Sequence, residues 1–322
     1  MDLDVSPLFQ PLQVKNKLFR NRIVMPPMVQ LRKITSPEGI GWYRERARGV
    51  ALVIVEATAV NRFGAELTVS HLRPLVDAIH EGGALAAIQL FPVTFDFPRT
   101  TPLPTPADLT LDDIAVIVRN YRLATEICSE AGFDGVEPHG AHNYLINQCF
   151  SPEQNTRTDA YGGSLENRMR FALGIVRTMR HVAEKAEMLL LYRHTPVGKG
   201  YGFSDSVRFV QYLIRDGVDV LDISPASADA PGDRSAPFTG LGVPVIAVNR
   251  MDEPERALEV LREKRADLIA VGRGLIADPE WVQKVRNGRF GDIIRCMRCD
   301  EGCHGHLKLG IPVTCVEWPA GF

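Results

Sequence analysis

The chain has 322 residues, of which 45% are hydrophobic and 24% are charged, and its formal net charge at pH 7 is −2. This composition supports a large core, and the dispersed lysines and arginines exclude a nucleic-acid-binding surface. The amino-terminal sequence has no basic or apolar region typical of a signal peptide, and no apolar run approaches the ~20 residues that span a bilayer. We therefore expect a cytoplasmic protein that binds neither nucleic acid nor a membrane.

Short apolar runs alternate with helical patterns along the whole chain, which is typical of parallel strands joined by crossover helices. The predicted strands are 22–25, 52–56, 85–89, 135–137, 188–193, 220–223, 245–248 and 268–271. The predicted helices are 42–48, 73–81, 111–131, 165–185, 204–215, 253–264 and 279–287, while the region 225–241 is poorly marked as a helix. The pattern predicts an α/β fold, a single (β/α)₈ TIM barrel with its active site at the carboxyl ends of the strands.

The most informative stretch follows the fourth predicted strand and extends from Val136 to Arg170. It presents His139, His142 and Tyr144 close together in the sequence. Two imidazoles just past a strand end can direct two N–H donors at one oxygen, and a tyrosine with an ordinary pKa of about 10 is a weak acid. This set suits polarising a carbonyl and delivering a proton. Structural histidines and a metal site are the alternatives for the histidines alone.

The same stretch reads HGAHNYL, followed by SP, N, RTD, YGGS and ENR, and it closely resembles the signature of the Old Yellow Enzyme family of FMN-dependent ene-reductases. The resemblance implies one bound FMN, with a glutamine at its pyrimidine edge and an arginine at its N1/O2 edge. Loops seven and eight of such a barrel are its usual phosphate site. The residues implied to bind FMN are Pro26, Pro27, Met28, Ala57, Gln89, Arg193, Asn249, Arg250, Gly272 and Arg273.

Two segments depart from the family pattern. Val29 stands where relatives often carry Thr or Cys, so it can donate no hydrogen bond to the flavin, and we expect an altered flavin potential. The loop after Gln89 is rich in proline and contains Phe91, Phe95 and Phe97 in place of the usual histidine-containing sequence. This loop either forms a wall of the substrate pocket or packs on the rim of the barrel.

Four of the six cysteines, Cys296, Cys299, Cys303 and Cys315, lie near the carboxyl terminus. In a reducing compartment their spacing indicates a zinc site or an iron–sulfur cluster. The segment resembles the 2,4-dienoyl-CoA reductase and 2-enoate reductase branch of the family, in which it holds a 4Fe–4S cluster, and we favour the cluster. The expected organisation is an FMN-binding barrel at 1–290 and a cluster-binding segment at 291–322. Relatives in that branch continue with FAD- and NAD(P)H-binding domains, whereas this sequence contains no GxGxxG motif.

The predicted function is reduction of the C=C bond of an α,β-unsaturated carbonyl or an enoyl or dienoyl thioester, with hydride from FMN. His139 and His142 hold the carbonyl oxygen and Tyr144 donates the proton. Electrons come from NAD(P)H, or through the cluster from a redox partner protein, and association into a homo-oligomer is left open. The alternatives are an amine dehydrogenase of the trimethylamine dehydrogenase type, an electron-transfer flavoprotein subunit, and a zinc-dependent hydrolase or aldolase.

Overall fold

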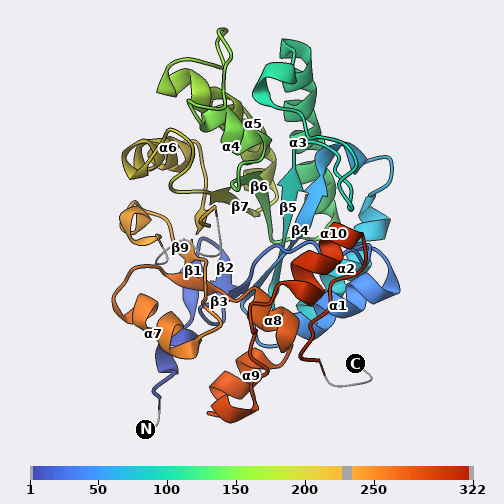
Figure 1. Ribbon diagram of the computed structural model, residues 1–322, viewed down its shortest axis with the longest axis vertical. Coiled ribbons are helices and arrows are strands. Elements are labelled where there is room, and N and C mark those ends of the chain that lie inside the picture. Colours follow the sequence, from blue (N-terminus) through green and yellow to red (C-terminus); the bar gives the residue numbers. More distant parts are fainter. Residues whose placement is uncertain (1–2, 227–233, 319–322) are drawn as a thin grey trace.

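The computed structural model describes residues 3–226 and 234–318. Eight parallel strands close into a barrel in which β10 pairs with β3, so the predicted TIM barrel is confirmed (Figure 1). The strands are β3 (Ile23–Met25), β4 (Leu52–Ala59), β5 (Leu85–Phe91), β6 (Gly135–Gly140), β7 (Leu189–His194), β8 (Val220–Ile223), β9 (Val245–Ala247) and β10 (Leu268–Ala270).

Helices surround the barrel, as Figure 1 shows. They are α1 (Pro37–Ala47), α2 (Val69–Glu81), α3 (Leu111–Ala131), α4 (Leu145–Phe150), α5 (Leu165–Lys185), α6 (Phe203–Arg215), α7 (Pro254–Arg262), α8 (Arg273–Ala277), α9 (Trp281–Arg286) and α10 (His306–Leu309). No helix in the described ranges is long and apolar enough to cross a membrane.

Helix α3 has the bounds predicted for it because both of its ends are encoded locally. Thr110 caps the first turn by accepting from the backbone N–H of Asp113, and the Asp113 carboxylate accepts from the Thr110 N–H in return. The helix ends at Gly132, whose φ of 98° lies in the left-handed region that glycine adopts without strain. Such signals need no tertiary contact, so they can be read from the sequence.

The structure also contains elements that the sequence patterns did not predict. An antiparallel hairpin of β1 (Leu12–Val14) and β2 (Lys17–Phe19) precedes the barrel, and the short helix α4 follows β6. Among the described residues between β8 and β9 there is only a 3-10 turn, η4 (Ala236–Phe238), where a sixth barrel helix was poorly marked. Part of that region, 227–233, lies outside the described residues.

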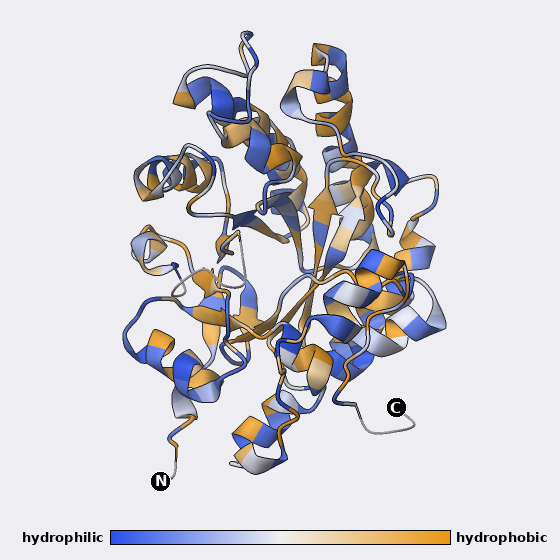
Figure 2. Cartoon of the chain, in the orientation of Figure 1, coloured by the Kyte–Doolittle hydropathy of each residue, from blue (hydrophilic) through white to orange (hydrophobic). Residues whose placement is uncertain are grey.

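The side chains inside the barrel change from apolar to polar along the barrel axis. Apolar side chains such as Leu52, Leu189 and Leu268 pack together inside it and against Phe19 of the hairpin. Towards the carboxyl ends the buried side chains are polar or charged, namely Gln89, Glu137, His139, Arg193 and Asp222. In Figure 2 the ribbons of β6 and β7 accordingly contain hydrophilic stretches within a mostly hydrophobic barrel. Buried charge of this kind requires compensating partners or a ligand.

The carboxyl-terminal segment folds back onto the barrel through the π-helical turn η6 (Glu301–Gly305) and helix α10. The backbone N–H of Val313 donates to the carbonyl of Gln30 at 3.0 Å, and the Trp318 indole donates to the carbonyl of Ile276 at 2.9 Å. These bonds hold the segment against the edge at which the strands end.

We predict that His194, which is fully buried, makes the stability of the fold sensitive to acid. Burial lowers the pKa of His194 to about 3, whereas in the unfolded chain it is about 6.5. The unfolded chain therefore binds one more proton between these values, and the free energy of unfolding falls by about 1.4 kcal/mol per pH unit below pH 6.5. When the pH is lowered from 7 to 5, the free energy of unfolding measured with urea should fall by about 2 kcal/mol more for the wild type than for a His194→Asn variant.

The exposed His181 provides the matched control, because a His181→Asn variant should retain the wild-type pH dependence. An equal loss of stability in wild type and His194→Asn would contradict the prediction.

Candidate active site

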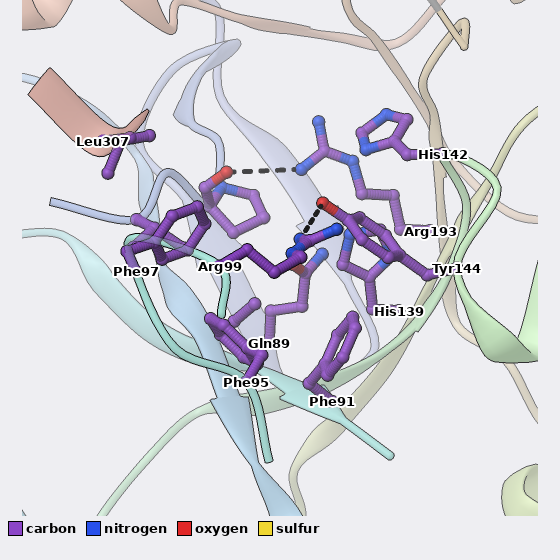
Figure 3. A pocket seen from close by; sticks show the side chains of 13 residues that line it. Gln89, Phe91, Phe95, Phe97, Arg99, His139, His142, Tyr144, Arg193 and Leu307 are labelled. Atoms are coloured by element: carbon purple, nitrogen blue, oxygen red, sulfur yellow. Dashed lines mark hydrogen bonds between the residues drawn. The ribbon is translucent and has the colours of Figure 1, made fainter. Parts of the chain in front are cut away.

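Two adjoining cavities open at the carboxyl ends of the strands, with volumes of about 190 and 510 Å³. Figure 3 shows the smaller one. Both cavities are lined by Pro27, Val29, His142, Tyr144, Arg193 and Leu307, so they form one continuous site. Leu307 belongs to α10, and the carboxyl-terminal segment therefore contributes directly to the wall.

The two histidines and the tyrosine meet at the smaller cavity. The ring centroid of His139 lies 5.3 Å from that of His142 and 5.1 Å from that of Tyr144. His139 is carried by β6, while His142 follows the strand with a φ of 57°, in the left-handed region. The hydroxyl of Thr195 accepts from the backbone N–H of His142 at 2.9 Å and holds this turn. The local sequence thus turns both imidazoles towards one cavity.

Both imidazoles are neutral at physiological pH. Burial, followed by the proximity of His142 and Arg193, lowers the pKa of His139 well below its ordinary value. Burial and the positive charge of Arg193 lower the pKa of His142 to about 3. The histidines can therefore act as neutral N–H donors, and they do not bring positive charge of their own to the site.

Hydrogen bonds select which ring nitrogen of each histidine carries the proton. His139 Nδ1 accepts from the Ala141 N–H at 3.3 Å, so its proton lies on Nε2. His142 Nε2 lies 2.7 Å from Ser224 Oγ, which accepts from Arg193 Nη2 at 3.1 Å. Because Arg193 can only donate, the Ser224 hydroxyl keeps its own hydrogen, which it can donate to His142 Nε2; in that arrangement the His142 proton lies on Nδ1.

Arg193 is itself held by a buried carboxylate that the sequence analysis did not identify. Its Nε lies 3.2 Å from Asp222 Oδ2, and both side chains are almost completely buried. A second buried carboxyl, Glu137, accepts from Gln89 Nε2 at 2.8 Å. Burial and the nearby Asp222 raise the pKa of Glu137 well above its ordinary value. Burial also raises the pKa of Asp222, but the adjacent Arg193 opposes this rise. We therefore assign the negative charge to Asp222, which pairs with Arg193, and treat Glu137 as the neutral carboxyl.

The residues expected around a flavin line the two cavities. Ala57 and Gln89 border the smaller cavity, and Pro27 and Arg193 border both. The larger cavity is bordered by Pro26, Met28, Asn249, Arg250, Gly272 and Arg273. Val29, which replaces the family's Thr or Cys, borders both cavities as well.

The larger cavity suits an extended anion. It is lined by the guanidinium groups of Arg193, Arg250, Arg273 and Arg298. Arg193, Arg273 and Arg298 are ion-paired with Asp222, Asp300 and Asp252, respectively, whereas Arg250 makes no ion pair with the described residues. A Cβ on Gly272 would lie 3.3 Å from Met28 Sδ and 3.4 Å from Pro26 Cγ, so a side chain there would narrow the cavity. These features fit FMN, which has a planar ring and a phosphate that arginines bind well.

The four carboxyl-terminal cysteines come together at a third, much smaller cavity. Burial raises the pKa of both Cys303 and Cys315. Within the described parts of the chain, no three His, Cys, Asp or Glu side chains converge to hold a single metal ion. Arg273 lines this cavity as well as the larger one, and its Nη1 donates to Asp300 at 2.7 Å. Cys128 and Cys149 are buried elsewhere.

The fold is that of barrel oxidoreductases of the Old Yellow Enzyme type. Residues 7–291 match the NADH:flavin oxidoreductase / NADH oxidase family, and the chain belongs to that family. The resemblance seen in the sequence is thereby confirmed, and with it FMN as the family's cofactor.

Similar proteins include an NADH oxidase from Thermoanaerobacter brockii, 33% identical over 92% of this chain and 53% of the relative. A metal reductase from Desulforamulus reducens is 32% identical over 97% of this chain and 53% of its own length. The chain thus spans about half the length of these two relatives. An NADPH dehydrogenase from Halalkalibacterium halodurans is 34% identical, covering 85% of this chain and 92% of the relative.

Two solved structures share the fold. A 2-naphthoyl-CoA reductase in complex with 2-naphthoyl-CoA superposes with a TM-score of 0.86 at 24% identity, covering 98% of this chain and 57% of that one. An Old Yellow Enzyme homologue from Zymomonas mobilis superposes with a TM-score of 0.74 at 23% identity, covering 87% and 92% of the two chains.

We predict that the two buried carboxyls respond differently to substitution. Asp222→Asn leaves Arg193 buried without its counter-charge and should lower the free energy of unfolding by roughly 3–5 kcal/mol. Glu137→Gln replaces a neutral carboxyl with a neutral amide of the same shape and should change it by less than about 1 kcal/mol. Urea denaturation of flavin-free protein at pH 7 measures both, and equal losses would contradict the assignment of charge.

Proposed function

We propose that the chain is an FMN-dependent ene-reductase that reduces the C=C bond of an α,β-unsaturated carbonyl compound or an enoyl or dienoyl thioester. The observation that carries the proposal is the convergence of His139, His142 and Tyr144 on a cavity continuous with one suited to FMN. When bound, FMN supplies the hydride that reduces the β-carbon of the alkene.

In this proposal the residues that border the two cavities would hold the flavin. Gln89 would meet its pyrimidine edge, and Arg193 its N1/O2 edge, where a fixed positive charge favours the reduced, anionic flavin. The other residues proposed to hold FMN are Pro26, Pro27, Met28, Ala57, Asn249, Arg250, Gly272 and Arg273. Arg250 is the best candidate for the phosphate, because its side chain is exposed and makes no ion pair within the described residues.

His139 and His142 are proposed to hold the carbonyl oxygen of the substrate. Their neutral rings leave His139 Nε2–H and His142 Nδ1–H as donors, since the other nitrogen of each ring is already bonded. Negative charge develops on the oxygen as the β-carbon is reduced, and preorganised donors stabilise it without reorganisation. A neutral donor is well suited, because it polarises the oxygen without transferring its proton.

Tyr144 is proposed as the general acid that protonates the α-carbon. Its ring packs against both His139 and Phe91, with centroid distances of 5.1 Å in each case, so its position is fixed by the cavity wall. The phenol oxygen accepts a long hydrogen bond of 3.4 Å from Arg99 Nη2.

The amine dehydrogenase alternative receives no comparable support. The smaller cavity is walled by Phe91, Phe95 and Phe97, and no tryptophan is among its described lining residues. The fold alone is shared with a histamine dehydrogenase, at 24% identity.

We further propose that Cys296, Cys299, Cys303 and Cys315 hold a 4Fe–4S cluster, with the segment 291–322 as its binding unit on the barrel of 1–290. All four thiols line one cavity, and in a 4Fe–4S cluster each thiolate binds its own iron, so they need not converge on one point. Thiols of this kind must stay reduced, which favours a cytoplasmic location. NAD(P)H or a one-electron redox partner docking near this segment would supply the electrons.

The assignment of the site is tested by variants of its three residues. His139→Ala and His142→Ala should each slow reduction of an enone by about 10²–10³ through loss of one donor to the oxygen. Tyr144→Phe should slow reoxidation of the reduced flavin by the enone by about 10²–10⁴ and leave flavin reduction nearly unchanged. Stopped-flow absorbance of the flavin measures the two half-reactions separately, with FMN content as a check on each variant.

Tyr212→Phe and His181→Ala, both away from the cavities, are the controls and should behave as wild type. Wild-type enone reduction by all three site variants would overturn the assignment. Purified protein that neither contains nor takes up FMN would overturn the proposed function as a whole.

The cluster is tested by composition. Anaerobically purified protein should contain iron and acid-labile sulfide in the proportion of a 4Fe–4S cluster, and Cys299→Ser should lose most of both. Cys128→Ala, which removes a buried thiol on α3, should keep the wild-type iron content. Stoichiometric zinc without iron would contradict the proposal.

A further inference from the structure

The smaller cavity has an aromatic wall formed by the loop that departs from the family pattern. The Phe91 ring lies 4.9 Å from that of Phe95, which lies 6.0 Å from that of Phe97, and Phe91 also contacts the Tyr144 ring at 5.1 Å. Figure 3 shows Phe91 beside His139 and Tyr144, with Phe95 and Phe97 continuing the wall away from them. The loop therefore forms a wall of the pocket and does more than pack on the barrel rim.

Arg99 lies at the end of this wall. Its guanidinium carbon is 5.6 Å from the centroid of the Tyr144 ring and 5.9 Å from that of Phe97, and Nη2 is 3.4 Å from the Tyr144 oxygen. Both rings lie within the roughly 6 Å over which a guanidinium is attracted to an aromatic face.

The positive charge of Arg99 is not neutralised by an ion pair with any carboxylate in the described ranges. The pKa of Asp96 is lowered mainly by a hydrogen bond from Thr100 and to a smaller extent by the charge of Arg99. The Asp96 carboxylate accepts from Thr100 Oγ1 at 2.5 Å and forms no ion pair with Arg99. The other arginine of this cavity, Arg193, is paired with Asp222 at 3.2 Å. Arg99 is thus the cation that this cavity offers to a ligand.

These features define the shape and charge of a ligand. A cavity of about 190 Å³ is smaller than the pockets of drug-sized molecules, so the ligand is compact. Its body meets phenylalanine rings and is apolar or aromatic. One end meets the fork of a guanidinium, which matches the two oxygens of a carboxylate.

We propose that Arg99 makes the enzyme selective for unsaturated carbonyl substrates that also carry a carboxylate. The inference rests on the proposed function, in which His139 and His142 hold the activating carbonyl. Arg99 then binds the carboxylate beside Tyr144, while Phe91, Phe95 and Phe97 contact the apolar body. Arg99 takes part in no bond making or breaking, because hydride and proton are still added across the C=C bond.

The test compares 4-oxo-4-phenyl-2-butenoate with its methyl ester, which lacks the negative charge and activates the C=C bond more strongly. This intrinsic difference in reactivity is the same for every variant, so the measured quantity is the change in the acid-to-ester ratio of kcat/KM. For the holoenzyme, Arg99→Gln should reduce this ratio by about tenfold, as expected for loss of one partly exposed charge-assisted bond. Effects of the substitution on Tyr144 apply to both substrates and cancel in the ratio. Arg99→Lys should keep part of the preference, because it retains the charge but not the fork.

Arg119→Gln is the matched control, since Arg119 is exposed on α3 away from the cavities, and it should keep the wild-type ratio. A ratio unchanged by Arg99→Gln would overturn the inference and leave the proposed function intact. If neither substrate is reduced, the proposed function fails. In that case the role of Arg99 is tested by calorimetric binding of the saturated acid, 4-oxo-4-phenylbutanoate. Binding to Arg99→Gln that is about tenfold weaker than to the wild type supports the carboxylate-binding role of Arg99, and equal binding overturns that role.

Discussion

The carboxyl edge of the barrel depends on the ion pair between Arg193 and Asp222. The pair lies inside the barrel, where an unpaired guanidinium would be strongly unfavourable, and it fixes a cation at the junction of both cavities. From this position Arg193 donates to Ser224, which bonds His142, and to the carbonyl of Pro27 at 3.4 Å. One guanidinium thereby orients an active-site imidazole and contacts the strand end that borders the flavin cavity.

The same charge explains why the histidines are neutral. Burial removes water from both rings, and the nearby Arg193 further disfavours their protonation. The barrel can tolerate these polar groups because its apolar layers are concentrated around the amino-terminal hairpin. The apolar layers inside the barrel and the candidate active site thus lie at opposite ends of the same eight strands, as is usual in barrels of this kind.

The carboxyl-terminal segment, which carries the four cysteines, also borders the two cavities of the candidate active site. Leu307 completes the wall of both cavities, and Gly310 approaches the Phe97–Pro98 backbone so closely that a Cβ would lie 2.4 Å from Pro98 Cδ. Arg273 lies between the larger cavity and the cysteines, bonded to Asp300. The segment that carries the cysteines therefore lines the two cavities of the candidate active site.

The sequence by itself determined the barrel and the bounds of helices such as α3, because hydrophobic periodicity and caps act over a few residues. It also indicated which residues gather at the carboxyl edge, since every parallel strand ends there. It did not reveal Asp222, Ser224, Arg99 or Leu307, whose roles depend on contacts with residues distant in the sequence. A charged or apolar residue in a loop has no distinguishing local pattern. Pairing of β7 with β8 places Asp222 opposite Arg193, and the folded loop after β5 brings Arg99 to Tyr144. These contacts arise only in the folded chain, because burial and distance are tertiary properties.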